Sequence, residues 1–148
     1  MNGVQRYYLE DLSVGMSETF SKKVTSDDIE IFAVVTGDRN PVHLDQAYAA
    51  TTLFKERIAH GMLTASFISA VLGTRLPGPG CVYLSQSLTF RAPVRIGDDV
   101  AARVTVTAVD PQKGRIQLET QCHVGETVVV DGEAILLVQR RPEQAGAA

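Results

Sequence analysis

The stretch that decides the fold of this chain is Gly61-Met62-Leu63-Thr64-Ala65-Ser66-Phe67-Ile68-Ser69-Ala70-Val71-Leu72-Gly73-Thr74-Arg75-Leu76. Apolar side chains occupy nearly every face of a helix drawn through it, so such a helix has to be surrounded by the rest of the domain. At a rise of about 1.5 Å per residue, it would be roughly 24 Å long. Pro77-Gly78-Pro79-Gly80 follows and ends the helix, because Pro and Gly both terminate helices. We therefore predict one central, buried helix.

After this helix, the apolar period changes to two. Alternate positions in the next segment are Val82, Leu84, Gln86, Leu88 and Phe90. Alternation of this kind is typical of half-buried antiparallel strands. The segment therefore predicts a strand with these five side chains pointing inward.

The same alternation recurs in 100–106 and 116–122, and a last strand is predicted for 127–139. Within that last strand we interpret Asp131-Gly132 as a bulge and not a hairpin turn, because Gly125-Glu126 already supplies a turn. A first strand at 18–24 completes a sheet of about five strands.

A single apolar helix followed by long antiparallel strands predicts an α+β domain whose sheet curls around the helix. The chain has 148 residues, of which 45% are hydrophobic and 21% charged, and this fits one globular domain. We treat 1–148 as a single domain with a loose tail at 142–148.

The charge distribution excludes several classes of partner. The formal net charge is −3, and no basic cluster exceeds the pairs Lys22-Lys23 and Arg140-Arg141, so we expect neither a nucleic-acid nor a membrane partner. Residues 1–10 lack a signal pattern, which predicts a cytoplasmic protein. Cys81 and Cys122 stand alone at positions predicted to lie in strands, so we expect buried free thiols and no catalytic nucleophile.

A carboxylate and an imidazole lie five positions apart in Asp38-Arg39-Asn40-Pro41-Val42-His43. The segment 25–36 before them predicts a short helix that begins with a weak capping box and ends before Gly37. Pro41 favours an extended backbone at Asn40, so we predict an irregular loop over 37–43, followed by a short helix capped by Asp45. Two titratable groups held on such a loop are typical of an acid/base pair.

These motifs resemble the MaoC-type (R)-specific enoyl-CoA hydratases of the hotdog fold. The resemblance extends over about 14–138 and is most specific in 38–43, 59–63, 83–90 and 90–98. It implies reversible addition of water to (2E)-enoyl-CoA to give (3R)-3-hydroxyacyl-CoA, with the CoA thioester as substrate and no cofactor. It also implies a homodimer whose two sheets join edge to edge.

Hydration of a conjugated thioester needs a base for the water, an acid for the α carbon, and donors for the enolate-like oxygen. The resemblance implies that Asp38 and His43 hold one water, from which hydroxide adds to the β carbon while a proton reaches the α carbon on the same face. We assign His43 the larger part in activating water and Asp38 that of proton shuttle, although the sequence does not separate the two roles. Gly61 is the predicted oxyanion donor, because a helix N-terminus offers unpaired N–H groups and a partial positive charge.

Two serines interrupt the apolar helix. Ser69, when aligned through Gly61, matches the functional serine of the family, and we predict that it steadies Asp38. A buried hydroxyl also commonly bonds back to its own helix, and this is the reading we favour for Ser66.

Three further polar residues are candidates for support. Asn40 is predicted to orient the loop or the water, with a simple turn role as the alternative. Gln86, as a polar side chain on an inward face, needs a buried partner, and we predict a bond to the loop of Asp38. His60 either points toward the thioester or braces the entry to the helix.

Other readings of the same residues stay open. A metal held by Asp38, His43 and His60 is disfavoured, because no short His or Cys spacing supports it. The same loop would also serve a dehydratase that acts on an acyl-carrier-protein thioester. A hotdog thioesterase and a noncatalytic acyl-CoA binding module are further alternatives. Neither the acyl-chain length nor the pathway, such as polyester monomer supply or fatty-acid oxidation, follows from the sequence.

Overall fold

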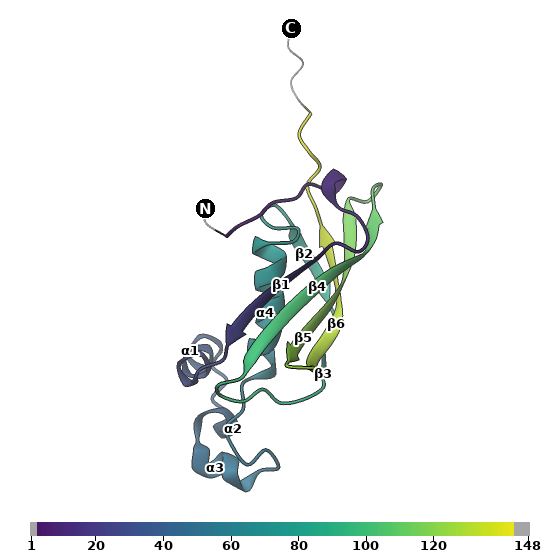
Figure 1. Ribbon diagram of the computed structural model, residues 1–148. Helices are drawn as coiled ribbons and strands as arrows, with labels where there is room; N and C mark the ends of the chain where they lie inside the picture. Colours follow the sequence, from purple (N-terminus) through teal and green to yellow (C-terminus); the bar gives the residue numbers. More distant parts are fainter. Residues whose placement is uncertain (1–2, 144–148) are drawn as a thin grey trace.

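The structure is a computed structural model that describes residues 3–143, and within these residues six antiparallel strands form one sheet (Figure 1). The strands are β1 (Ser17–Lys23), β2 (Val82–Gln86), β3 (Thr89–Phe90), β4 (Asp99–Asp110), β5 (Arg115–Val124) and β6 (Thr127–Leu137). Their order is β1-β4-β5-β6-β2, and β3 also pairs with β6. The helices are the 3-10 helix η1 (Leu9–Asp11), and α1 (Ser26–Thr36), α2 (Pro41–Leu44), α3 (Gln46–Thr51) and α4 (Gly61–Thr74).

Helix α4 lies along one face of the sheet and contacts β1, β4, β5 and β6 (Figure 1). Ile68, Val71 and Leu72 on this helix are at most 1% exposed, as expected for a helix that the domain surrounds. The α+β hotdog architecture predicted from the sequence is therefore confirmed. The helix ends at Thr74, two residues before the predicted end.

The central strands follow the predicted alternation. Buried residues alternate along β4 and β5, where they include Val104 and Leu118. Cys122 is buried on β5 as predicted, whereas Cys81 is only partly buried and lies just before β2, not in a strand. Both are free thiols, and burial raises the pKa of each, that of Cys122 to about 12.

The single strand predicted over 82–91 is divided into β2 and β3, so the sheet has six strands and not about five within the described residues. The division lies at Ser87, whose main chain approaches Gly132 so closely that a Cβ there would be 1.8 Å from the Ser87 carbonyl oxygen. Strand β6 runs unbroken through Asp131-Gly132, which excludes a hairpin. The bulge predicted there is also wrong, because the register between β5 and β6 shifts between Cys122 and His123.

The prediction that 82–90 is half-buried is wrong for the isolated chain. Val82 is 50% exposed, Leu84 43% and Phe90 52%. The reason is their position: Val82 and Leu84 lie on β2, the last strand of the sheet, and Phe90 lies on β3, which within the described residues pairs with β6 alone. A pattern of alternation does not distinguish an edge strand from a central one.

The segment before α4 forms three short helices at one end of the sheet (Figure 1). The capping box of α1 is confirmed, with Thr25 Oγ1 accepting from the N–H of Asp28 and the Asp28 carboxylate accepting from the N–H of Thr25. Gly37 ends this helix with φ of 80°, a left-handed conformation that glycine adopts without strain.

The irregular loop predicted over 37–43 is wrong at its end, because Pro41–Leu44 forms the helical turn α2. Pro at the first position of a helix loses no hydrogen bond, since that N–H has no partner within the helix. Asn40 caps the turn by accepting from the N–H of Val42 at 3.1 Å. Asp45 caps α3 as predicted.

No helix within residues 3–143 combines the length and the apolar character needed to cross a bilayer. Residues 142 and 143 of the predicted tail have no regular structure, and 144–148 lie outside the described residues.

Candidate active site

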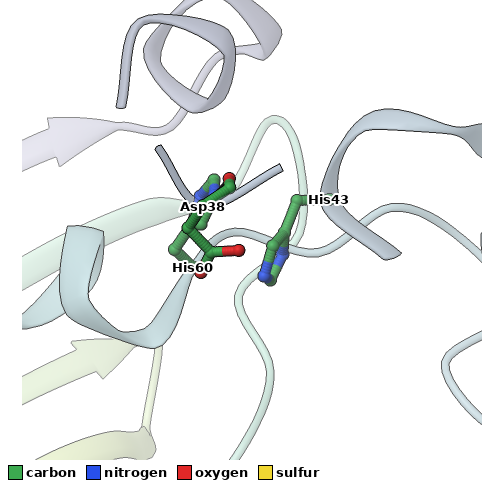
Figure 2. A group of neighbouring side chains, drawn as sticks. All are labelled: Asp38, His43 and His60. Carbon is green, nitrogen blue, oxygen red and sulfur yellow. Dashed lines mark hydrogen bonds between the residues drawn. The ribbon is translucent and has the colours of Figure 1, made fainter. Parts of the chain in front are cut away.

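The structure brings Asp38, His43 and Gly61 together in the wall of one cavity of about 530 Å³. Asp38 follows α1, His43 lies on α2, and Gly61 is the first residue of α4. Figure 2 shows the Asp38 carboxylate directed toward the His43 ring, with His60 beside them. The rest of the wall is mainly apolar and consists of Phe54, Ile58, Ala59, His60, Met62, Thr64, Phe90, Arg91, Ala92, Pro93, Val94 and Val130.

His43 is 8% exposed, and its Nδ1 lies 2.8 Å from the carbonyl oxygen of Ile58. Because a carbonyl oxygen only accepts, Nδ1 carries the proton, and the lone pair of the neutral ring is on Nε2. Burial is the largest cause that lowers the pKa of His43 from its ordinary value of 6.5. His43 is therefore arranged as an uncharged base.

The main chain of His43 is also fixed. Its carbonyl oxygen accepts from Nε of Arg57 at 2.6 Å, and Nη1 of Arg57 donates to Ser26 Oγ at 3.0 Å. One guanidinium thus ties α2 to the first turn of α1. Arg57 was not predicted as a site residue, because no motif around it in the sequence indicates this contact.

Asp38 is exposed in the isolated chain and is held by short-range bonds. Its Oδ1 accepts from the N–H of Asn40 at 3.1 Å, and its own N–H donates to Thr36 Oγ1 at 3.2 Å. Asn40 thus orients the loop through its main chain and caps α2 through its side chain.

His60, the residue before α4, is only 2% exposed. Its Nε2 donates to the carbonyl oxygen of Asp38 at 3.0 Å, and its ring stacks on that of His43 with 3.9 Å between centroids. It does not project toward the cavity as a free donor, so of the two predicted roles the structure favours bracing.

Gly61 presents its main chain to the cavity where α4 begins. The first N–H groups of a helix have no partner within it, and the helix dipole gives this end a partial positive charge. A Cβ at Gly61 would lie 2.7 Å from Cε1 of Phe90. The space beside Gly61 is thus filled by the aromatic ring, so a larger residue fits there only if the ring or the start of α4 moves.

One ligand atom each from Asp38, His43 and His60 lies within 4.8 Å of the others, and this set could in principle hold a cation. However, His43 Nδ1 and His60 Nε2 already bond to carbonyl oxygens. The remaining nitrogen of His60, Nδ1, is fully buried. The absence of a metal stays a prediction.

Two predicted supporting contacts differ in the structure. Ser69 is exposed on α4, and no hydrogen bond joins it to Asp38 within residues 3–143. Gln86 donates to Thr120 Oγ1 at 2.8 Å and to the Ser87 carbonyl, and it does not bond to the loop of Asp38. The reason is its place on β2, where its amide reaches the buried hydroxyl of Thr120 on β5.

The helical back-bond predicted for Ser66 is present. Its Oγ donates to the carbonyl oxygen of Leu63 at 2.5 Å. Ser66 is thus satisfied within its own helix, and its side chain needs no partner in the cavity.

Comparison with known proteins agrees with this arrangement. The MaoC like domain family matches residues 13–129. The 3-hydroxybutyryl-CoA dehydratase of Methylorubrum extorquens is 55% identical over 136 residues, which cover 92% of this chain and 87% of that protein. The (R)-specific enoyl-CoA hydratase of Rhodospirillum rubrum is 53% identical over 135 residues, which cover 91% and 94%.

Among solved structures, the unliganded R-hydratase of Pseudomonas aeruginosa superposes with a TM-score of 0.89 at 44% identity, covering 98% of this chain and 96% of that one. The family match spans more than half of the chain, and the relatives are similar over most of their length. The chain therefore belongs to the MaoC-like family.

Proposed function

We propose that this protein is a hydratase that adds water reversibly to (2E)-enoyl-CoA and gives (3R)-3-hydroxyacyl-CoA. The observation that carries the proposal is the meeting of Asp38, His43 and Gly61 in one mainly apolar cavity. The two similar proteins named for hydration and for dehydration of CoA thioesters support it, because the two names describe opposite directions of one reaction.

The spacing of the two side chains suits a shared water. A water that makes two tetrahedral hydrogen bonds of about 2.8 Å holds its partners about 4.6 Å apart. A carboxylate oxygen of Asp38 and a ring nitrogen of His43 lie no more than 4.8 Å apart, which is close enough for one water to bridge them. A water between them would donate one hydrogen to the carboxylate and the other to Nε2.

The reaction then follows from this arrangement. As the water oxygen bonds to the β carbon, His43 Nε2 takes one of its protons, and the electrons of the double bond move toward the thioester oxygen. The N–H of Gly61 donates to that oxygen and stabilises its negative charge. A proton returns from the pair to the α carbon on the same face, with Asp38 as shuttle, so that one H and one OH are added.

We propose that no cofactor takes part. Proton transfer by Asp38 and His43 and hydrogen bonding by Gly61 supply the acid, base and oxyanion functions that the reaction needs. Hydration after exhaustive dialysis against a chelator is expected to equal that of the untreated protein. Loss of hydration that added Zn²⁺ restores would contradict this proposal.

CoA is the proposed carrier, because both curated relatives described above carry CoA in their names. The alternative is an acyl-carrier-protein dehydratase with the same chemistry, and kcat/KM on matched enoyl-CoA and enoyl-carrier substrates distinguishes the two. A cytoplasmic location is also proposed, since Cys81 and Cys122 are free thiols, as is usual in a reducing compartment.

A homodimer is proposed from the exposed edge of the sheet. Val82, Tyr83 and Leu84 are each at least 41% exposed on β2, and an apolar edge strand in a soluble domain usually has a partner. Sedimentation of the wild type should give twice the mass of the chain, and Leu84→Lys should shift it toward the monomer. A monomeric wild type would contradict the dimer but not the activity.

The decisive experiment uses crotonyl-CoA, the enoyl thioester that corresponds to 3-hydroxybutyryl-CoA. Loss of the conjugated-thioester absorbance without release of thiol is the expected result, and a dehydrogenase selective for the (3R) isomer should consume the product. Thiol release without hydration would indicate a thioesterase, and binding without turnover a noncatalytic module. Asp38→Asn and His43→Gln should each lower kcat by about 10² to 10⁴. Near wild-type rates in both would refute the site.

A further inference from the structure

We propose that His60 is a positioning residue of this site, whose imidazole fixes Asp38 and the ring of His43 relative to one another and whose main chain begins the first turn of α4. The proposal rests on the proposed hydratase function. Neither the family match nor the names of the relatives assign a role to this side chain.

The contacts of His60 reach all three groups. Its Nε2–H donates to the main chain of Asp38 at 3.0 Å. One face of its ring lies on His43, with an angle of 30° between the planes, while Phe32 lies 4.9 Å from it at a tilt of 55°. Its carbonyl oxygen accepts from the N–H groups of Leu63 and Thr64 and so closes the turn that presents Gly61.

The stack with His60 completes the constraint on His43. The bond from Nδ1 to Ile58 fixes one atom of the His43 ring, but the ring could still tilt about that bond. The flat face of His60 at 3.9 Å removes this tilt and thereby sets the direction of Nε2. Because Nε2 is the atom that would take the proton, its direction determines whether the water is in line with the substrate.

The unpaired nitrogen of the His60 ring indicates that this residue has a functional role and does not only fill space in the core. Its Nδ1 is buried and has no hydrogen-bond partner within residues 3–143, an arrangement that lowers stability. An apolar ring in the same place would fill the space without this cost. What the imidazole adds is a flat ring that carries a donor at its tip, so that one residue both stacks on His43 and holds Asp38.

Two substitutions separate these two contributions. His60→Phe keeps a flat ring between Phe32 and His43 but removes the donor to Asp38. His60→Gln keeps an N–H near the position of Nε2 but removes the ring. His123→Gln is the matched control, because His123 lies on β5, bonds to Gln121, and takes no part in the cavity.

We expect His60→Phe to lower kcat by roughly 10-fold to 100-fold, with a much smaller change in KM, because a shift of about 1 Å in a catalytic group costs about that much. The acid limb of the pH–rate profile should also move to higher pH. Two effects should raise the pKa of His43 in this variant. The face of the new Phe ring stabilises a protonated imidazole beside it. The electrostatic effect of His60, which lowers the pKa of His43, is also removed. Asp38, Arg57 and Arg91, the other charged groups near His43, are unchanged in this variant.

The His43 titration is also measured by NMR on the protein without substrate. The chain has three histidines, so His123→Gln and the His60 variants assign every imidazole signal. This readout does not depend on turnover. If the wild type fails to hydrate crotonyl-CoA, the proposed function fails, while the predicted shift of the His43 midpoint still tests the positioning role.

A His60→Phe protein with kcat within twofold of wild type and an unchanged His43 midpoint would overturn the proposal. If this variant does not fold, His60→Gln replaces it. The expected result for His60→Gln is a reduced kcat and a displaced His43 midpoint, and wild-type values for both would overturn the proposal equally.

Discussion

The substitution Gly61→Ala gives the most direct test of the oxyanion donor. The added methyl carbon would lie 2.7 and 2.8 Å from two ring carbons of Phe90. Carbon atoms in contact are normally about 3.5 to 4.0 Å apart, so the ring or the first turn of α4 has to move by about 1 Å. A displacement of about 1 Å at a reacting group costs about 10²-fold in rate, and loss of one oxyanion donor costs about 10² to 10³ in kcat.

The effect of Gly61→Ala on stability should be much smaller. Overpacking costs about 1–3 kcal/mol, but Phe90 is 52% exposed and has room to rotate away. Replacing Gly by Ala also returns about 0.4–1 kcal/mol through the unfolded state. The net loss of about 0–2.6 kcal/mol corresponds to a fall in Tm of at most roughly 10 °C, measured by calorimetry. The variant should thus remain folded while kcat on crotonyl-CoA falls by about 10²-fold.

A double-mutant cycle with Phe90→Ala identifies the cause. If the methyl group acts by steric contact with the ring, the double variant should hydrate crotonyl-CoA nearly as fast as Phe90→Ala alone. If it acts by blocking the approach of the thioester, no recovery is expected. A Gly61→Ala protein with the wild-type kcat would refute the assignment of Gly61 altogether.

Three further predictions concern His43, α1 and Gly132. Because burial lowers the pKa of His43 below 6.5, kcat/KM should stay high at pH 6.5 and fall only in more acidic solution, and a midpoint above 6.5 in the pH–rate profile would contradict this. Between the pKa of His43 in the folded protein and that in the unfolded chain, the folded protein binds fewer protons. The contribution of His43 to the free energy of unfolding should therefore decrease as pH falls through 6.5 and level off below the folded pKa. Urea titrations at several pH values check this. Thr25→Ala removes the capping box and should cost about 1 kcal/mol, seen as a Tm lower by about 2–4 °C. Gly132→Ala would place a methyl carbon 1.8 Å from the Ser87 oxygen and should abolish the folded form or lower Tm far more than Thr25→Ala does.

The elements that the sequence predicts well are those with short-range causes. The capping box at Thr25, the cap at Asp45 and the helix that begins at Gly61 depend on neighbours within four residues. The alternation in β4 and β5 also predicts burial correctly, since both strands lie in the middle of the sheet. Asp38, His43 and Gly61 come together because the helices α1 to α4 bring them to one end of the sheet.

The predictions that were wrong concern features that depend on residues far apart in the sequence. Whether Val82 and Leu84 are buried depends on which strand ends the sheet, and the alternation is the same in either case. The partner of Gln86 is Thr120, 34 positions away, and the contact of Arg57 with Ser26 joins residues 31 positions apart. Local pattern carries no information about such pairs. The short helix that begins at Pro41 was missed for a local reason. Pro disfavours a helical conformation in the residue before it, but it is well suited to the first position of a helix.

The contact between Phe90 and Gly61 joins the border of the sheet to the start of α4. Phe90 lies on β3, in the same border region as the apolar surface of β2. Whatever covers that border would also restrict the motion of the Phe90 ring and so tighten the cavity at Gly61. If the proposed homodimer covers it, dilution of the protein would loosen the cavity at Gly61, and specific activity would depend on protein concentration.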